Sequence, residues 1–516
     1  MPEKVLKKLN TYVLPQWKVC FFSAIIVGLL AHLYKITNWL PNWDSLVFRY
    51  DSQNMIALGR WFLPVVCSFS SFYDLPFLNG ITAIVFHALS ACCICRIFNV
   101  QKKITAFLIG AVIVSFPTVT SVMMYNYVAD GYSIAFFFST IGALFMTKEK
   151  PKYILSAILI ALATGIYQAY ITVTIMLVLL KLIDEMIFHN VTFVTILKKA
   201  ALMLLSGVVG VAVYGIVLKI ILAVSSVELL DYQGVNTAAS LSSLDLAGSL
   251  YVIKETFLKC FFDLSKGLNI HVTLNCFVLL FTALYYLKSI VKGRLYKNPV
   301  NILMIVILCV MLLFGAGALA FVNAGIDYHS LMLMGYSVFY LFFLLIYERG
   351  TECHDKRTAV KCWIVLLTAA AIILNQIVIA NVSYHKAQIA YEKSYGVLMR
   401  IADRIEQTPG AEDCDKILVI GALDNSEEYS ADIMLNITGI TDGFIIRADD
   451  ETVGQSVLIS SLNDYCDKNY KFVSGEEKKE IIQRKEVKSM DEWPKENCVA
   501  IMENTIIIKL DAEGEN

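Results

Sequence analysis

The apolar run from Tyr153 to Ile183, YILSAILIALATGIYQAYITVTIMLVLLKLI, decides the predicted fold, because it can cross a bilayer either once or twice. Its 31 residues would form a straight helix of about 46 Å, because an α-helix rises about 1.5 Å per residue. The hydrocarbon core of a bilayer is only about 30 Å thick. Because Gly165-Ile166-Tyr167-Gln168 lies near the centre of the run, the segment forms either one long tilted helix or a hairpin of two short ones.

The surrounding sequence predicts a multi-spanning membrane protein. The chain has 516 residues, of which 57% are hydrophobic and 17% charged, and its mean hydropathy is +0.63. Soluble proteins are about 45–50% apolar and about a quarter charged, so an ordinary soluble protein is excluded. Further apolar runs fall at about 17–34, 77–98, 104–122, 128–147, 199–224, 273–291, 299–322, 330–347 and 361–380.

Positive charge decides between the two forms of the 153–183 run, because Lys and Arg accumulate in short cytoplasmic loops. With a hairpin all the basic clusters fall on one side of the membrane, whereas a single helix moves every later cluster to the other side. The clusters are Lys4/Lys7/Lys8, Arg96/Lys102/Lys103, Lys148/Lys150/Lys152, Lys198/Lys199, Lys292/Arg294/Lys297 and Arg349/Lys356/Arg357. The hairpin is therefore favoured, with about eleven spans, a cytoplasmic N-terminus and an outward C-terminus.

The predicted fold class is mainly α, a polytopic membrane helical bundle over residues 1–382 with a small extracytoplasmic α/β domain over 383–516. The outward loops would be 35–76, 123–130, 165–170, 225–272 and 323–329, and they contain most of the acidic, aromatic and amide residues of the membrane part. In the fourth loop, Leu246–Leu268 has apolar residues at helical spacing. This helix either lies on the membrane surface or packs on neighbouring spans.

The C-terminal part differs in charge from the rest. Residues 408–516 contain 24 acidic and 11 basic residues, a balance of −13, although the whole chain carries −1. Such a split indicates a membrane part followed by an acidic water-soluble domain. We expect a helix at about 383–407 and strands at Lys416–Gly421, Gly443–Ile446, Ser456–Ile459 and Thr505–Leu510.

No metal site is predicted from the cysteines, because Cys414, Cys466 and Cys498 of the C-terminal part lack zinc-type spacing. Asp413-Cys414-Asp415 is similar to the DxD of nucleotide-sugar transferases. Nucleotide sugars are not supplied outside the cell, so we interpret this match as coincidence.

The first outward loop combines carboxylates with a permanent cation. Asp44 and Asp51 are seven residues apart and would project from nearly the same face of a helix, and Arg60 lies between Gly59 and Trp61. At the membrane surface an arginine can bind the phosphate of a lipid-linked sugar as a leaving group. A carboxylate can accept the proton of an attacking hydroxyl. The alternative is a solvated loop with incidental ion pairs.

Several short motifs occur in an order that is typical of one family. They are WDSL at Trp43–Leu46, GRW at Gly59–Trp61, YDLP at Tyr73–Pro76, FP at Phe116–Pro117, ADGY at Ala129–Tyr132, GIYQAY at Gly165–Tyr170, RIADRIEQ at Arg400–Gln407 and DEWP at Asp491–Pro494. Through them the chain resembles, over nearly its whole length, the integral-membrane glucosyltransferases related to the type II O-antigen glucosyltransferases of the GT-C superfamily.

The resemblance implies an enzyme that transfers a hexose, often glucose, from a polyprenyl-phosphate carrier to a cell-envelope glycan. It implies a plasma-membrane location, an inverting displacement and a base in the first outward loop, Asp44 first and Asp51 second. No cofactor is required, and a divalent cation is possible but not indicated. The partners would be the lipid-linked donor, the glycan acceptor and the bilayer, without nucleic acid.

Other loop residues are candidates for substrate binding. Tyr132 and Trp61 belong to the quoted motifs, and Tyr167 and Gln168 at the hairpin tip either line the sugar site or only end two short helices. Asp130 either binds the acceptor or caps the span that follows it.

The turn 323–329 departs from the family pattern, in which a basic residue begins the next span. The nearest candidate here is His329, which either contacts the donor phosphate, making affinity pH-dependent, or starts a helix without a catalytic duty.

Other classes of function fit the sequence less well. A transporter or flippase for lipid-linked sugars would place ionisable residues at mid-membrane, whereas here they gather in the outward loops. A polysaccharide polymerase or ligase would have loops richer in arginine. A receptor or scaffold would not need eleven spans with polar residues on one side.

Overall fold

The computed structural model describes residues 2–4, 13–41, 43–47, 55–189, 191–230, 245–262, 270–350, 356–421, 423 and 451–511. The chain forms two compact units. The bundle unit comprises Met1–Thr37, Ser52–Asn381 and Asp432–Ile437, and the tail unit comprises Asn38–Asp51, Val382–Ala431 and Thr438–Asn516. The segment 38–51 of the first predicted outward loop is therefore part of the tail unit.

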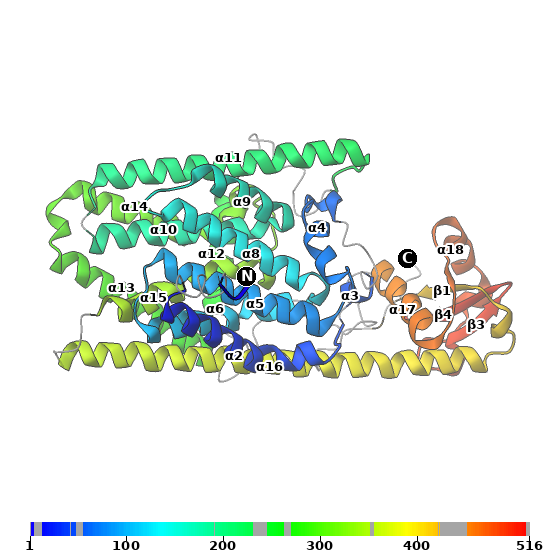
Figure 1. Ribbon diagram of the computed structural model, residues 1–516. Helices are drawn as coiled ribbons and strands as arrows, with labels where there is room; N and C mark the ends of the chain where they lie inside the picture. The colour runs from blue at the N-terminus through cyan, green and yellow to red at the C-terminus, as the bar shows by residue number, and fades with distance from the viewer. Residues whose placement is uncertain are drawn as a thin grey trace. The chain divides into compact units, whose positions relative to one another are not determined.

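The described part of the bundle unit is helical (Figure 1). Its longer helices are α2 (Pro15–Thr37), α5 (Pro76–Ile97), α6 (Lys103–Ser115), α7 (Pro117–Met124), α8 (Asn126–Thr147), α9 (Tyr153–Ile166), α10 (Ile171–Phe188), α11 (Phe193–Ser225), α12 (Leu246–Phe262), α13 (Ile270–Lys292), α14 (Pro299–Gly315), α15 (Val338–Arg349) and the first half of α16 (Lys356–Gln407). Short 3-10 segments are η1 (Ile56–Leu58), η2 (Ser68–Ser70), η3 (Gln168–Tyr170), η6 (Leu295–Lys297), η7 (Ala318–Phe321) and η8 (Ser330–Ser337), and α4 (Leu63–Cys67) is a single turn.

Within the described residues, eight helices are long and apolar enough to cross a membrane, and α9 and α14 are shorter apolar helices. The chain is therefore a mainly helical protein with the composition of a multi-spanning membrane protein. The number of crossings, predicted at about eleven, stays a prediction, because it depends on how α9, α10 and α14 are counted.

Proline marks the beginning of several helices. α5, α7 and α14 begin at Pro76, Pro117 and Pro299, where the missing N–H would lack a helical partner anyway. Asn298 adds a cap to α14, because its side chain accepts hydrogen bonds from the backbone N–H groups of Val300 and Asn301. These local signals set the boundaries of long apolar segments that hydrophobicity alone would not separate.

The run that opened the sequence is broken, as predicted, at Tyr167. Its backbone is extended (φ −155°, ψ 118°) between α9 and η3. Next to the break, Gly165 permits the close approach of Trp61, because a Cβ there would lie 2.6 Å from Cε2 of Trp61. The Gly165 carbonyl accepts a hydrogen bond of 2.8 Å from the N–H of Phe62, so the first loop segment is fixed to the hairpin tip.

The two arms of the hairpin run in opposite directions along α8. In α9, Ser156 donates a 2.6 Å hydrogen bond to the Gly142 carbonyl, and Tyr167 stacks on Tyr132. In α10, Thr174 donates a 2.9 Å hydrogen bond to the Ser139 carbonyl, so the chain has turned back toward the end of α8. The hairpin therefore exists, and its tip lies at the beginning of α8.

The predicted amphipathic helix corresponds to α12, and it packs on its neighbours. Ile253 and Phe261 are buried, and Ser249 donates a 2.7 Å hydrogen bond to the Ala320 carbonyl of η7. A Cβ at Gly317 would lie 2.9 Å from Ile253. These contacts agree with the second of the two interpretations, a helix that packs on neighbouring spans, and a position on the membrane surface stays a prediction.

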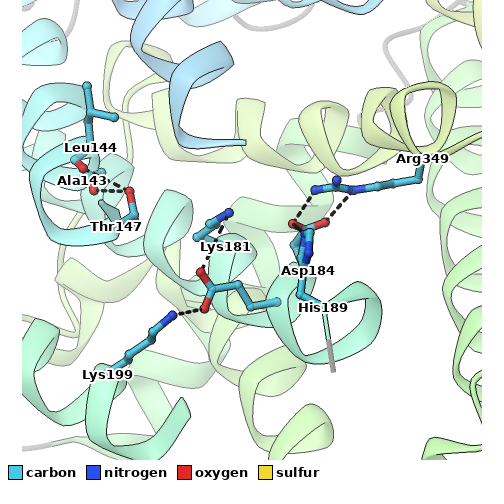
Figure 2. Close-up of polar contacts among 9 residues, drawn as sticks. Ala143, Leu144, Thr147, Lys181, Asp184, His189, Lys199 and Arg349 are labelled. Carbon is cyan, nitrogen blue, oxygen red and sulfur yellow. Dashed lines mark hydrogen bonds and ion pairs between the residues drawn. The ribbon is translucent and has the colours of Figure 1, made fainter. Parts of the chain in front are cut away.

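Charged residues gather at the end of the bundle where α15 finishes, which we call the Arg349 end. Asp184 is fully buried, and Arg349 binds both of its oxygens at 3.1 and 2.5 Å (Figure 2). Next to this pair, the Glu185 carboxylate of α10 forms an ion pair of 2.5 Å with Lys199 of α11 and lies 3.9 Å from Nζ of Lys181. These pairs join α10, α11 and α15 at this end.

One helix, α16, belongs to both units. It has 52 residues and so is about 78 Å long at 1.5 Å per residue. The last predicted span and the predicted tail helix therefore form one continuous helix. The sequence of this segment contains no proline, and its single glycine is Gly396.

The tail unit contains a four-stranded sheet of β1 (Lys416–Ile420), β2 (Lys471–Phe472), β3 (Val499–Met502) and β4 (Thr505–Lys509). Its order is β2-β1-β4-β3, with β1 parallel to β2 and β4, and β3 antiparallel to β4. Alternate residues of β1 and β4 face opposite sides. One side packs against α16, α17 (Glu451–Cys466) and α3 (Trp43–Val47), and the other packs against α18 (Gly475–Ile482) and α19 (Lys485–Lys488).

The strand predictions of the tail are partly correct. β1 and β4 lie where Lys416–Gly421 and Thr505–Leu510 were predicted, whereas Gly443–Ile446 lies outside the described residues. The strand at Ser456–Ile459 is wrong, because this segment is inside α17. Its apolar residues follow the spacing of a helix instead, because Leu458 and Leu462, which are four residues apart, are both buried.

Candidate active site

The candidate site lies at the tip of the 165–170 hairpin, which we call the Arg60 end of the bundle. Gly59 has φ +77° and ends η1 in the left-handed conformation, which glycine adopts without steric cost. A Cβ at this position would lie 2.6 Å from the Tyr214 hydroxyl and 2.8 Å from Nε2 of Gln168. The backbone before Arg60 therefore approaches both side chains so closely that only glycine fits.

Hydrogen bonds fix this approach. Gln168 donates from Nε2 to the Leu58 carbonyl at 2.9 Å, and the Tyr214 hydroxyl of α11 donates to the Gly59 carbonyl at 3.1 Å. Gln168, predicted as a substrate-binding residue, thus also supports the loop that carries Arg60. Tyr214 was not predicted, because nothing in the apolar run of α11 distinguishes it.

Arg60 is oriented by two tyrosines from different helices. Its Nη1 donates a 2.9 Å hydrogen bond to the Tyr132 hydroxyl of α8. Its guanidinium carbon lies 4.7 Å from the centre of the Tyr167 ring. The rings of Tyr132 and Tyr167 stack on each other at 4.4 Å with an angle of 9°. The structure thus brings together three of the predicted residues, Arg60, Tyr132 and Tyr167.

Trp61 packs on the hairpin rather than projecting into the surroundings. Its indole covers the face of Gly165, and its Nε1–H is buried with no hydrogen-bond acceptor among the described residues. Buried donors usually have a partner, and an exception requires an explanation such as a water or a ligand. Its predicted role in substrate binding stays a prediction.

Asp130 lies inside α8, which begins at Asn126. The interpretation of Asp130 as a helix cap is therefore wrong. The carboxylate is 2% exposed, accepts the Gly131 N–H at 2.8 Å and interacts with the Ser70 hydroxyl of η2. Asp130 therefore contacts the first loop segment, one turn away from the start of α8.

A second polar cluster at this end was not predicted. The Asp74 carboxylate accepts a 2.7 Å hydrogen bond from Asn126, whose backbone carbonyl accepts one of 3.1 Å from Asn79. Lys35 is 1% exposed and interacts electrostatically with Asp74. Two signals could have found this cluster: Asp74 lies within YDLP, and Lys35 directly follows an apolar run.

The remaining predicted residues lie elsewhere or are not described. His329 immediately precedes η8, next to Ser330, which bonds Ser121 of α7 at 2.8 Å. Asp44 is half-buried in α3 of the tail unit. Asp51 lies outside the described residues. The structure therefore does not test the roles predicted for His329, Asp44 and Asp51.

Taken together, the Arg60 end presents an oriented cation beside aromatic rings and polar side chains. A guanidinium is the usual protein group for binding a phosphate in a fixed geometry. In the described ranges, no three His, Cys, Asp or Glu residues are grouped so that they could bind a metal ion.

Comparison with known proteins identifies the family. The model of the family described as glucosyl transferase GtrII matches residues 33–345, a range that contains Asp44, Arg60, Asp130, Tyr167 and His329. The match confirms, over residues 33–345, the family that the motifs of this range indicated. No curated protein and no solved structure matches the chain. Since the match covers more than half of the sequence, the chain belongs to the glucosyl transferase GtrII family.

Proposed function

We propose that this membrane protein transfers glucose from a polyprenyl-phosphate donor to a glycan of the cell envelope. Family membership supports the glucosyltransferase role. One structural observation supports the phosphate-linked donor: the Arg60 guanidinium is oriented by the Tyr132 hydroxyl and the Tyr167 ring. An arginine held in a fixed orientation can stabilise a phosphate whose negative charge increases as the bond to the sugar breaks.

The proposed reaction is a single inverting displacement. A hydroxyl oxygen of the acceptor forms a bond to the anomeric carbon, and the bond from that carbon to the phosphate oxygen breaks. The electron pair leaves with the polyprenyl phosphate, which Arg60 stabilises, with His329 as the second candidate for this role. The hydroxyl proton passes to Asp44, or to Asp51 as the second candidate.

Around the sugar we assign supporting roles to residues of the Arg60 end. Trp61 offers its buried N–H to a sugar hydroxyl, and Asp130 accepts a hydrogen bond from the acceptor. Tyr132 and Tyr167 orient Arg60 and present aromatic surface, and Gln168 fixes the loop. No cofactor is required in this scheme.

The setting of the reaction is also part of the proposal. The protein would be a GT-C transferase of the plasma membrane with about eleven spans, a cytoplasmic N-terminus and an extracytoplasmic C-terminal domain. The Arg60 end would then face outward, where lipid-linked sugars meet the envelope glycan.

The base is tested with purified protein in nanodiscs, polyprenyl-phosphate glucose and a cell-envelope glycan extract. We expect wild type to transfer glucose and Asp44→Asn to bind donor without transferring it. Glu412→Gln, an exposed carboxylate of the tail, serves as the control and should keep full activity. If Asp51→Asn transfers no glucose and Asp44→Asn remains active, Asp51 is the base. Movement of intact lipid-linked sugar between leaflets, without transfer, would show a flippase instead.

A further inference from the structure

The segment that carries Asp44 is built into the hydrophobic core of the tail unit. Leu46 is 5% exposed and belongs to the same core cluster as Leu398 and Ile401 of α16 and Val457 and Leu458 of α17. Its neighbour Ser45 is fully buried. A loop that follows a membrane span does not need such a core, since polar loops are usually at the surface.

The same segment is also fixed on the other side of Asp44. The Trp39 ring lies 6.3 Å from Tyr391 of α16, edge to face at 73°, and 6.3 Å from Tyr465 of α17. Leu40 is 4% exposed. Asp44 therefore lies between two anchors, Trp39 and Leu40 before it and Ser45 and Leu46 after it, and both anchors belong to the tail unit.

Close packing of these anchors restricts the conformation of the segment that contains Asp44. Side chains in a protein core are packed at the density of crystals, so the buried Leu46 and the partly buried Trp39 ring packed on the same core restrict the position of Asp44 between them. α3 is a single helical turn of five residues, too short to be stable by itself. Its conformation therefore depends on the tail core.

We infer that the C-terminal domain is a working part of the transferase, in which Leu46 and Trp39 are positioning residues that fix the proposed base Asp44. The inference rests on the proposed function. It gives the domain a role in the reaction itself.

The test compares two core substitutions on opposite sides of one sheet. Leu46→Ala removes an anchor of the Asp44 segment, whereas Val487→Ala removes a side chain that is also buried, 1% exposed against 5% for Leu46, from the core on the other side. Both should lower the melting temperature of the protein in nanodiscs. Leu46→Met, which preserves most of the volume, tests for rescue.

We expect Leu46→Ala to lower kcat by about tenfold or more, since small misplacements of a reacting group cost up to about a hundredfold in rate. KM for the polyprenyl-phosphate glucose donor should stay within about twofold, because the donor is bound by other residues. Val487→Ala should keep kcat within about twofold at a temperature where both variants are folded, and Leu46→Met should recover most of the loss.

Equal effects of Leu46→Ala and Val487→Ala on kcat would overturn the inference, and so would full activity of Leu46→Ala. If Leu46→Ala does not yield folded protein, Trp39→Phe is judged by the same comparison. Transfer by wild type together with an active Asp44→Asn would also overturn the inference while leaving the transferase intact. A wild type that transfers no glucose would contradict the proposed function itself.

Discussion

Arg60 shows how one side chain acquires a direction from residues far away in the sequence. One guanidinium nitrogen is fixed by the hydrogen bond that it donates to the Tyr132 hydroxyl, and the Tyr167 ring covers one face of the guanidinium. Cation–π contacts of this kind contribute about 0.5–2 kcal/mol. A planar guanidinium can use both interactions and still offer donors to a phosphate, which a lysine ammonium cannot do in the same geometry.

For this reason Arg60→Lys should lower kcat/KM for the lipid-linked donor about ten- to hundredfold, because a hydrogen bond to a charged group contributes about 1.5–3 kcal/mol. The measurement is the initial rate of glucose transfer as a function of donor concentration. Arg484→Lys, which changes an exposed arginine of the tail, is the control and should have no effect. An Arg60→Lys variant with wild-type kinetics would show that Arg60 does not bind the phosphate.

Asp415 gives a pH-dependent prediction for the tail. Its hydrogen bond from Lys471, at 3.0 Å, holds the pKa of the Asp415 carboxyl below its ordinary value of 3.8, with a further contribution from Asn504. A depressed pKa means that the folded tail favours the charged form. The stabilisation is therefore present above about pH 4 and disappears as the pH falls through the lowered pKa.

Asp415→Asn should consequently lower the melting temperature at pH 7, and the difference from wild type should shrink as the pH falls below about 4. Differential scanning calorimetry between pH 3 and pH 7 measures this. A difference that stays constant over this range would show that the charge of Asp415 does not stabilise the fold.

Among the elements, the 153–183 hairpin depends on one close contact. Gly165→Ala would place a methyl group 2.6 Å from Cε2 of Trp61, and overpacking of this kind costs about 1–3 kcal/mol. We expect a lower melting temperature and slower glucose transfer, because Trp61 and Arg60 are neighbours. Gly207→Ala in α11 is a matched control, since nothing lies within 4 Å of its added Cβ, and it should be neutral or stabilising. Equal melting temperatures for the two variants would show that the close contact between Gly165 and Trp61 does not constrain the hairpin.

A buried and an exposed ion pair can be compared in the same chain. Arg349→Met leaves the fully buried Asp184 without its bidentate partner, and breaking a buried pair in this way costs about 3–5 kcal/mol. Arg484→Met breaks the exposed pair with Glu503 and should cost about 1 kcal/mol or less. Denaturant unfolding of both variants measures the loss of unfolding free energy. A loss for Arg349→Met no larger than that for Arg484→Met would show that the Arg349 end does not depend on this ion pair.

The sequence predicted elements well where a local signal was strong. The break at Tyr167 was expected from Gly165 near the centre of an over-long apolar run, and the strands starting at Lys416 and Thr505 were expected from apolar β-branched runs. Ser456–Ile459 was wrong because a short apolar run fits a buried helix face as well as a strand. The cluster of Asp74, Asn79 and Asn126 was missed because its members are joined only by the packing of α5 against α8.

For the whole molecule, the uneven distribution of charge along the sequence predicted a membrane part and an acidic C-terminal part, and this division into domains stays a prediction. The assignment of 38–51 to the tail unit could not be predicted, since it depends on contacts between Trp39 or Leu46 and residues more than 300 positions away. Sequence motifs indicated the family, and the family model confirmed it over residues 33–345.

The central claim, a lipid-linked donor bound through its phosphate, is tested most directly by one comparison of donors. Wild-type protein in nanodiscs is given labelled glucose on polyprenyl phosphate or on uridine diphosphate, with the same glycan acceptor. The account predicts labelled glycan from the polyprenyl-phosphate donor alone, without added nucleotide or metal. Transfer from the nucleotide donor, and none from the lipid-linked one, would contradict it.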